Sequence, residues 1–289
     1  MIRVADEVRD AGAVVALETT LVAHGFPPGE GVEVGLEAER RVRAAGAVPA
    51  TIGVLGGEVV VGLTEGELAR FDADARKVGP RDLAACAVQG AVGATTVGGT
   101  LAVCRRVGIR AMGTGGLGGV HRGWNESAPD VSADLGELVR CQALVVSSGV
   151  KSLLDVYATM EVLETLGVPV LGWRTDDLPL FYAARGGPPV SARVETADEV
   201  ARIAVAHWDV LDGRGILVAR PPDDSLDDIE PLIDDALRAA EEEGVRGQQV
   251  TPFVLSYLHD RSGGRTLRAN KELVAANAQL AAEIAVALR

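Results

Sequence analysis

The sequence contains few aromatic residues, few cysteines and no long apolar run. Aromatic residues make up 3% of the 289 positions although 47% are hydrophobic, so the core must be built mainly from Ala, Val and Leu, as close packing of helices on a sheet permits. The three cysteines are far apart, without metal-ligand spacing, which indicates buried free thiols in a reducing compartment. The N-terminus is charged, and no apolar run reaches the roughly 18 residues of a membrane span. We therefore expect a cytoplasmic protein with no membrane partner.

Basic residues are also in deficit, with 28 Lys and Arg against 41 Asp and Glu and a net charge of −13 at pH 7. This excess of acid argues against a general nucleic-acid surface. Any phosphate group would have to be bound locally. Lys77 and Arg81 form a basic island in the acidic chain and are a candidate phosphate clamp. A plain surface turn is the alternative for this segment.

Short apolar runs rich in β-formers alternate with segments of helical periodicity along the whole chain. This alternation is typical of crossover units and predicts an α/β fold, with a mostly parallel central sheet and helices on both faces. The loop 185–190 is the best candidate boundary, but the same alternation resumes beyond it, so we predict a single domain, residues 1–289. The predicted strands are 13–17, 48–55, 58–63, 109–113, 142–148, 168–173 and 215–219, and the predicted helices are 31–45, 81–90, 98–107, 134–140, 152–166, 197–211, 227–243 and 266–288.

Lys151 follows an apolar run, residues 142–149, that ends in a small-residue turn. We expect a buried strand with an amine at its carboxyl end. The next stretch, 152–166, has helical apolar spacing, which predicts Lys151 in the first turn of a helix. The positive end of the helix dipole and burial would both disfavour the cation and leave the amine nucleophilic toward a sugar carbonyl. From this segment alone, an exposed surface lysine is the alternative.

A G-x-G-x-x-G match occurs at residues 113–118, after a plausible strand. A dinucleotide-binding fingerprint opens directly into a helix, whereas this segment continues into 120–129, which has no helical period and ends in proline. We therefore expect no nicotinamide cofactor. The glycines beside Thr114, His121 and Arg122 form a backbone-lined loop able to hold an anion or a polar ring. A merely tight loop is the alternative.

Two further segments carry carboxylates in informative places. Asp130 and Asp134 are four residues apart at a predicted helix start, where paired carboxylates and nearby oxygens suit a hard divalent cation. Simple helix capping by Asp130 is the alternative. Glu18 interrupts the carboxyl end of an apolar strand, where burial would raise the pKa of its carboxyl and make it a general acid near neutrality. His24, shortly after it, is expected to be a turn residue.

Taken together, these segments resemble the pseudouridine-5′-phosphate glycosidase family, also called the indigoidine synthase A-like family, over nearly the whole chain. The strings that carry the resemblance are Ala16-Leu-Glu-Thr-Thr-Leu21, His24-Gly-Phe-Pro27, Gly46-Ala-Val-Pro-Ala-Thr-Ile52, Ala94-Thr-Thr-Val97, Thr114-Gly-Gly-Leu-Gly-Gly-Val-His-Arg-Gly123, Asp130-Val-Ser-Ala-Asp-Leu135, Gly149-Val-Lys-Ser-Leu-Leu-Asp155 and Thr251-Pro-Phe253.

The resemblance implies an enzyme, usually a homotrimer, that uses Mn²⁺ and reversibly cleaves the C–C glycosidic bond of pseudouridine 5′-phosphate to uracil and ribose 5-phosphate. It implies that Lys151 is the nucleophile, Glu18 the proton donor and Asp130 the metal ligand. The substrate-binding positions that it implies are Lys77, Val97 through its backbone, Thr114, His121, Ser132, Ala133, Asp134 and Asn277. The chain departs from the family pattern at Gly79-Pro80, which predicts weaker phosphate binding.

The chemistry expected from this set avoids the departure of a uracil carbanion. Glu18 would protonate the ribose ring oxygen while Lys151 attacks the anomeric carbon, giving a ring-opened, imine-bound intermediate that water releases. The alternatives are a lysine-dependent hydrolase or lyase acting on another sugar phosphate, as in a pigment pathway, and a non-catalytic sugar-phosphate sensor. The intact set of Glu18, Lys151 and Asp130 argues against the sensor.

Overall fold

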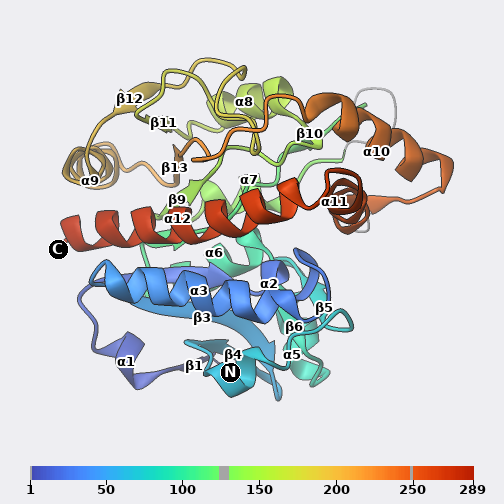
Figure 1. Cartoon of the computed structure of the whole chain (residues 1–289). Coiled ribbons are helices and arrows are strands. Elements are labelled where there is room, and N and C mark those ends of the chain that lie inside the picture. Colours follow the sequence, from blue (N-terminus) through green and yellow to red (C-terminus); the bar gives the residue numbers. More distant parts are fainter. Residues whose placement is uncertain (1, 124–129, 248–249) are drawn as a thin grey trace.

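A mixed sheet carries most of the strands in the computed structural model, which describes residues 2–123, 130–247 and 250–289 (Figure 1). Strands β2, β3, β7, β9, β13, β11 and β12 run parallel, and β4 joins β3 antiparallel. The strand order is β1 (Ile2–Val4), β4 (Glu58–Val61), β3 (Val48–Leu55), β2 (Val14–Glu18), β7 (Ala111–Gly113), β9 (Leu144–Ser147), β13 (Ile216–Ala219), β11 (Val170–Trp173), β12 (Ala192–Val194). Beside this row, β6 (Gly93–Thr95) pairs with β3, and β5 (Arg76–Val78) pairs with β6. The predicted α/β fold is confirmed.

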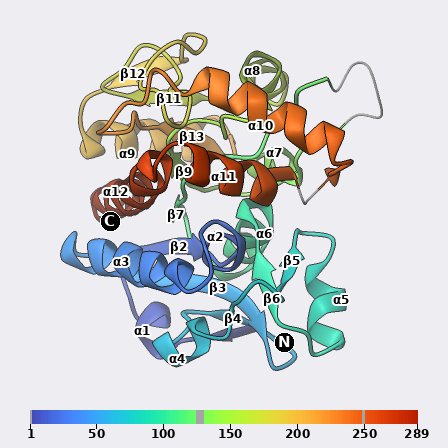
Figure 2. The ribbon, with the colours of Figure 1, turned by 45° about the vertical axis from the view of Figure 1, so that its right-hand side comes forward.

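Helices cover both faces of this sheet. The long C-terminal helix α12 crosses one face, where it contacts β2, β7 and β9 and lies between α3 and α9, while α6 and α7 pack together on the other face (Figures 1 and 2). The helices are α1 (Asp6–Arg9), α2 (Thr20–His24), α3 (Glu30–Ala44), α4 (Glu65–Leu68), α5 (Leu83–Val88), α6 (Val97–Val107), α7 (Ala133–Leu138), α8 (Val156–Thr165), α9 (Ala197–Val205) with the π-helical turn Ala206–Val210, α10 (Glu230–Glu242), α11 (Val250–Arg261) and α12 (Arg265–Ala287).

Small residues allow α12 to approach the sheet closely. A side-chain carbon placed on Gly113 of β7 would lie 2.7 Å from Cα of Ala278, well inside van der Waals contact. Ala278, Ala281 and Ala282 of α12 are completely buried. Since a bulky side chain does not fit between elements packed this closely, the scarcity of aromatic residues and the abundance of Ala and Gly follow from the packing.

Two differences from the sequence-based expectations bear on the site. Helix α8 begins at Val156, capped by Asp155, whose Oδ1 accepts the Ala158 N–H at 2.9 Å. The predicted start near 152 is therefore wrong, and Lys151 lies in a loop. Helix α11 was not predicted, because its apolar residues show little periodicity and it contains Pro252. Proline is tolerated there because the first-turn N–H groups of a helix have no intrahelical partner.

The parallel pairing fixes where the loops gather. In the paired register Leu17 lies opposite Gly113, and Gly113 opposite Val146, so the chain leaves β2, β7 and β9 at the same edge of the sheet. The loop after β9 turns at Gly149, which has φ +73° and would place a side-chain carbon 2.1 Å from the Pro179 carbonyl oxygen. Only glycine fits this turn. In the described part of the chain no helix is both long and apolar enough to cross a bilayer.

Candidate active site

A small cavity of about 60 Å³ lies at this edge of the sheet. The ends of three parallel strands contribute to it: Glu18 from β2, Thr114 after β7 and Lys151 after β9. Lys77 of β5 adds a second amine. The remaining lining residues are Thr20, Leu21, His24, Gly25, Gly115, Gly116, Ser152, Leu153, Phe181, Thr251, Pro252, Leu255 and Asn270. The cavity therefore combines a carboxyl group and two amines within mostly apolar walls, as substrate sites commonly do.

Glu18 is the buried acid of the cavity, with 7% of its surface exposed. Thr114 donates a hydrogen bond to its Oε1 at 2.5 Å. Burial raises the pKa of the Glu18 carboxyl, and this effect outweighs the positive charge of Lys151 and the hydrogen bond from Thr114, which both act in the opposite direction. Glu18 is thus suited to hold a proton at a higher pH than an exposed carboxyl would.

Lys151 is held by its backbone in the loop between β9 and β10 (Leu154–Asp155). Its N–H donates to the Leu117 carbonyl at 3.1 Å, and its own carbonyl accepts the Leu154 N–H at 3.0 Å. The side-chain stem passes beside Gly116, where an added carbon would lie 3.3 Å from Lys151 Cγ and 2.6 Å from Cδ2 of Phe181. Gly116 therefore leaves the space that the Lys151 stem and the Phe181 ring require.

Lys77 is the second amine, and it is mostly buried in β5. Burial, together with the positive charge of Lys151, lowers the pKa of Lys77 to about 8. His24, also in the wall, donates a hydrogen bond from Nε2 to the Ala75 carbonyl at 2.9 Å, and burial lowers the pKa of its ring. The ring is therefore neutral near pH 7, and Lys77 is the cation on this side.

The two aspartates that the sequence placed together have separate surroundings. Asp134 is buried and accepts two backbone N–H groups, Gly98 on Oδ1 at 2.7 Å and Gly118 on Oδ2 at 3.0 Å. The Asp130 side chain is 54% exposed, and its Oδ2 lies 3.9 Å from Nδ1 of His121. Ser132, rather than Asp130, caps α7 by accepting the Asp134 N–H at 3.2 Å. Asp134 thus braces two glycine segments, and Asp130 is the more accessible carboxylate.

The start of α6 leaves one backbone donor at Val97. Thr96 Oγ1 accepts the Gly99 N–H at 3.1 Å, and Asp134 accepts that of Gly98. Within the described ranges, the Val97 N–H is the first-turn donor of α6 without a backbone or side-chain acceptor. Ala133 is the first residue of α7, so its N–H is likewise a helix-start donor.

Asn277 lies behind the cavity wall instead of lining it. It is fully buried, and its Nδ2 donates to the Thr114 carbonyl at 2.8 Å and to Ser148 Oγ at 3.1 Å. It therefore joins the loop after β7 to the loop after β9. Asn270, which lies seven residues earlier on the same face of α12, lines the cavity. Sequence reasoning missed Asn270, Phe181 and the α11 residues, although the i, i+7 spacing from Asn277 pointed to Asn270.

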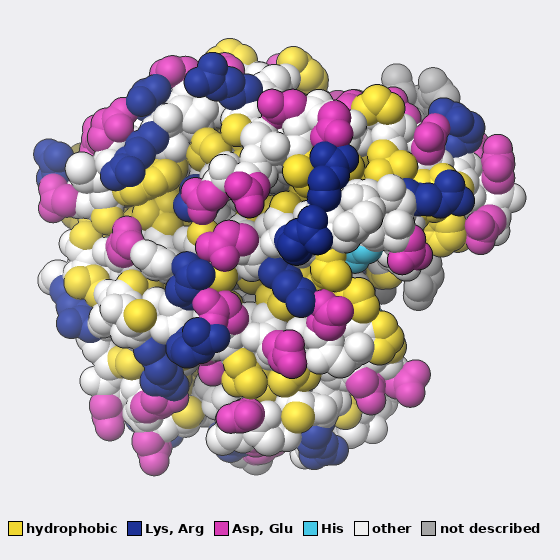
Figure 3. Space-filling model, viewed as in Figure 1, with side chains coloured by type: hydrophobic (Ala, Val, Ile, Leu, Met, Phe, Trp, Pro, Cys, Tyr) yellow, Lys and Arg dark blue, Asp and Glu magenta, His cyan; other side chains and the backbone are white. Residues whose placement is uncertain are grey.

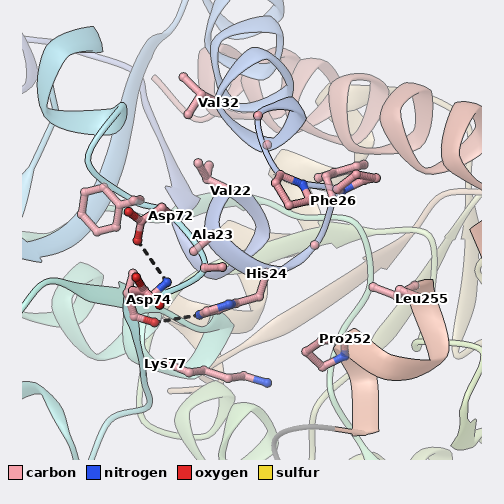
Figure 4. A pocket seen from close by; sticks show the side chains of 18 of the residues that line it. Val22, Ala23, His24, Phe26, Val32, Asp72, Asp74, Lys77, Pro252 and Leu255 are labelled. Carbon is pink, nitrogen blue, oxygen red and sulfur yellow. Dashed lines mark hydrogen bonds between the residues drawn. The ribbon is translucent and has the colours of Figure 1, made fainter. Parts of the chain in front are cut away.

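A groove of about 1170 Å³ adjoins the cavity. The two share His24, Gly25, Lys77, Pro252 and Leu255. Figure 4 shows His24 and Lys77 on one side of the groove, and Pro252 and Leu255 of α11 on another. Because the cavity alone is smaller than the space that a nucleotide-sized ligand occupies, such a ligand would have to extend toward this groove.

The raised pKa of Glu18 predicts a stability difference with a definite sign. Because the folded-state pKa is above the ordinary value, the contribution of Glu18 to stability is fully present at acid pH and is lost as pH rises through the folded pKa. Glu18→Gln removes this loss. We expect its melting temperature to exceed that of the parent protein at pH 8, where each kcal/mol is worth roughly 2–4 °C, and the gap to close toward acid pH.

Thermal unfolding followed by circular dichroism at several pH values measures this difference. Glu242→Gln, an exposed change on α10, is the control and should leave the melting temperature within error of the parent at every pH. A Glu18→Gln variant that melts below the parent at pH 8 would mean that the folded protein stabilises the Glu18 carboxylate, which contradicts a raised pKa.

Comparison with known proteins gives relatives over nearly the full chain. A family model described as indigoidine synthase A like protein matches residues 3–287. A protein from Nocardioides sp. (strain ATCC BAA-499 / JS614) named pseudouridine-5′-phosphate glycosidase is 45% identical over 288 residues, 98% of this chain and 94% of that protein. One of the same name from Streptomyces griseus subsp. griseus is 47% identical over 281 residues, 95% of this chain and 87% of that protein.

Solved structures agree with these sequence matches. The prealnumycin C-glycosynthase AlnA in complex with ribulose 5-phosphate has a TM-score of 0.89 and 39% identity, covering 100% of this chain and 97% of that one. An indigoidine synthase A-like protein from Thermotoga maritima has a TM-score of 0.88 and 39% identity, covering 99% and 96%. The resemblance inferred from the sequence strings is thereby confirmed, and the chain belongs to the indigoidine synthase A-like family.

Proposed function

We propose that this protein is an enzyme that reversibly cleaves the C–C glycosidic bond of pseudouridine 5′-phosphate, giving uracil and ribose 5-phosphate. The observation that carries the proposal is the pairing of Glu18, a buried acid with a raised pKa, and Lys151, an amine, in the wall of one cavity. The names of the relatives from Nocardioides and Streptomyces support the substrate. The ribulose 5-phosphate bound by the C-glycosynthase supports a pentose-phosphate site.

In the proposed reaction, Lys151 Nζ forms a bond to C1′ of the ribose while Glu18 gives its proton to the ring oxygen, and the C1′–O4′ bond breaks. The nitrogen lone pair then forms C1′=N as the bond from C1′ to C5 of uracil breaks. C5 of uracil takes a proton before this bond breaks, so the electrons of the bond restore the C5=C6 double bond and no free uracil carbanion forms. Water adds to the imine and releases Lys151 and the aldehyde of ribose 5-phosphate. The net change is the addition of one water molecule.

The remaining predicted contacts divide into two groups. The first group is proposed to bind the phosphate. It consists of the Lys77 cation, the Val97 N–H, and the backbone donors and hydroxyl of the segment Ser132–Asp134. Thr114 and His121 are the candidates nearest the sugar, and Asn277 supports Thr114 from behind. The homotrimer and the cytoplasmic location stay predictions.

We propose Mn²⁺ as the cofactor, held at Asp130. No group of three or more His, Cys, Asp or Glu side chains gathers as a metal site in the described ranges, so a set supplied entirely by side chains does not fit. A single accessible carboxylate fits a hard divalent ion that keeps several waters. When bound, the ion would supply positive charge for phosphate or water, while His121 lies beside the same carboxylate.

This metal assignment predicts that Asp130→Asn lowers the Mn²⁺ content of the purified protein, because the variant keeps the side-chain shape but loses the negative charge. Elemental analysis after dialysis against Mn²⁺ measures it. Asp155→Asn, at the cap of α8, is the matched control. Equal manganese in the Asp130 variant and the parent would contradict the assignment.

The lysine mechanism predicts a covalent adduct on one particular lysine. The sequence has only three, Lys77, Lys151 and Lys271, and the lowered pKa of Lys77 makes it the rival nucleophile. After incubation with ribose 5-phosphate and reduction with borohydride, we expect the adduct on the peptide containing Lys151. Lys151→Ala should form no adduct and release no uracil from pseudouridine 5′-phosphate, whereas Lys271→Ala should behave as the parent.

An adduct on Lys77 would overturn the assignment of the nucleophile. An adduct on Lys151 without uracil release by the parent would instead favour the alternative function, a lysine-dependent enzyme acting on another sugar phosphate, to which the C-glycosynthase neighbour also points.

The phosphate role of Lys77 predicts a pH-dependent KM. Because the pKa of Lys77 is about 8, its ammonium is lost as pH rises through that value. In the synthesis direction, the KM for ribose 5-phosphate should rise as the pH increases from about one unit below this pKa to about one unit above it. Lys77→Arg keeps the cation throughout, so its KM should stay nearly constant. A parent KM that does not change over this range would contradict a phosphate role for Lys77.

A further inference from the structure

Arg122 has no role in the proposed reaction, and its guanidinium makes contacts on two sides. On one side its Nη2 donates to the Ser152 carbonyl at 2.9 Å and its Nε to the Leu154 carbonyl at 3.4 Å. On the other side it pairs with two carboxylates of α10, Nη2 with Glu230 and Nη1 with Asp234, both at 2.8 Å. A single guanidinium thus joins the loop of the candidate nucleophile to a helix distant in sequence.

The base of this side chain is fixed. His121, the preceding residue, belongs to β8 (Val120–His121), which pairs antiparallel with β10 and places His121 opposite Leu154. Arg122 therefore leaves the strand pair directly beside the segment whose carbonyl groups it binds. The carbonyls belong to the first and third residues after Lys151, and the Lys151 carbonyl bonds the Leu154 N–H in the same turn.

The helix on the other side is connected to the cavity. Helix α10 packs against α11, and the two lie side by side in Figures 1 and 2. Helix α11 supplies Thr251, Pro252 and Leu255 to the cavity wall. Arg122 consequently links α10, and through it the α11 cover of the cavity, with the loop that carries the Lys151 amine.

The two sides of the link differ in strength. The side chains of Glu230 and Asp234 are about half exposed, at 53% and 54%, and exposed ion pairs contribute little individually. The contacts to the Ser152 and Leu154 carbonyls are partly buried and use the fork geometry of a guanidinium, which an ammonium does not reproduce. The carbonyl contacts are thus the ones that hold the loop, and the carboxylates orient the guanidinium.

We propose that Arg122 is a positioning residue that holds the Lys151 loop in its reactive place and couples it to the α10–α11 cover of the cavity. The inference that Arg122 positions the loop is based on its contacts alone. The effect of this positioning on the reaction rate rests on the proposed function. A displacement of about 1 Å at a reacting group can lower a rate on the order of 100-fold, so a small movement of this loop suffices.

Hydrogen exchange tests the positioning without any assumption about activity. In Arg122→Met, which keeps much of the stem but loses every donor, the amides of Lys151 and Leu154 should exchange about tenfold faster or more, because their loop opens more often. Arg238→Met is the matched control, since Arg238 is an exposed arginine of α10 that pairs only with Asp235 among the described residues. It should leave exchange at 151–155 unchanged.

Borohydride trapping of ribose 5-phosphate tests the consequence for the rate. Trapping at Lys151 should slow about tenfold or more in Arg122→Met, with only partial recovery in Arg122→Lys. The double variant Glu230→Gln, Asp234→Asn keeps the carbonyl contacts, so the trapping rate should stay within about twofold of the parent. Its KM for ribose 5-phosphate should rise, because α10 and α11 are then no longer linked to the loop. Far-ultraviolet circular dichroism verifies that each variant is folded.

Unchanged exchange at 151–155 in a folded Arg122→Met would overturn the proposal, and so would faster exchange with trapping at the parent rate. If Arg122→Met does not fold, Arg122→Lys decides in the same way. A parent protein that forms no adduct would refute the proposed function, and the exchange comparison would still decide whether Arg122 positions the loop.

Discussion

The hydrogen bond from Thr114 to Glu18 is the contact on which the rest of the site depends. It joins the ends of β2 and β7, two neighbouring parallel strands, and it fixes the orientation of the buried Glu18 carboxyl group. Asn277 holds the carbonyl of the same threonine and also Ser148, so α12 ties this contact to the loop that leads to Lys151. Hydrogen bonds therefore join the segment that carries the acid to the loop that carries the amine, as one unit.

This unit is unfavourable electrostatically and is held in place by the surrounding core. Burial raises the pKa of the Glu18 carboxyl, and burial together with the positive charge of Lys151 lowers the pKa of Lys77. The charged forms of these groups are less stable in the site than in water, which is the usual condition of catalytic acids and nucleophiles. Completely buried core residues of β2, β9 and α12, such as Val15, Leu144 and Ile284, anchor the elements that carry or support these groups.

Much of the fold followed from the sequence, because alternating apolar runs and helical periods are local signals. Glu18 and Lys151 were also accessible to this reasoning, since both stand where a buried strand ends. The separate surroundings of Asp130 and Asp134 were not, because two backbone donors far apart in sequence, Gly98 and Gly118, decide them. Likewise α11 lacks periodicity, and the place of Asn270 depends on how α12 crosses the sheet. Local patterns contain no information on such long-range contacts.

The close approach of β7 and α12 at Gly113 and Ala278 limits how this site can change. A side chain at Gly113 is excluded sterically, so the segment after β7 that forms the inner wall of the cavity, beginning at Thr114, keeps its position as long as the two elements stay in contact. The acidic and basic side chains scattered over the face in Figure 3 impose no comparable restriction. New substrate preferences therefore have to arise on the outer side, through α11 and the loops, while the acid and the amine stay where the inner wall places them.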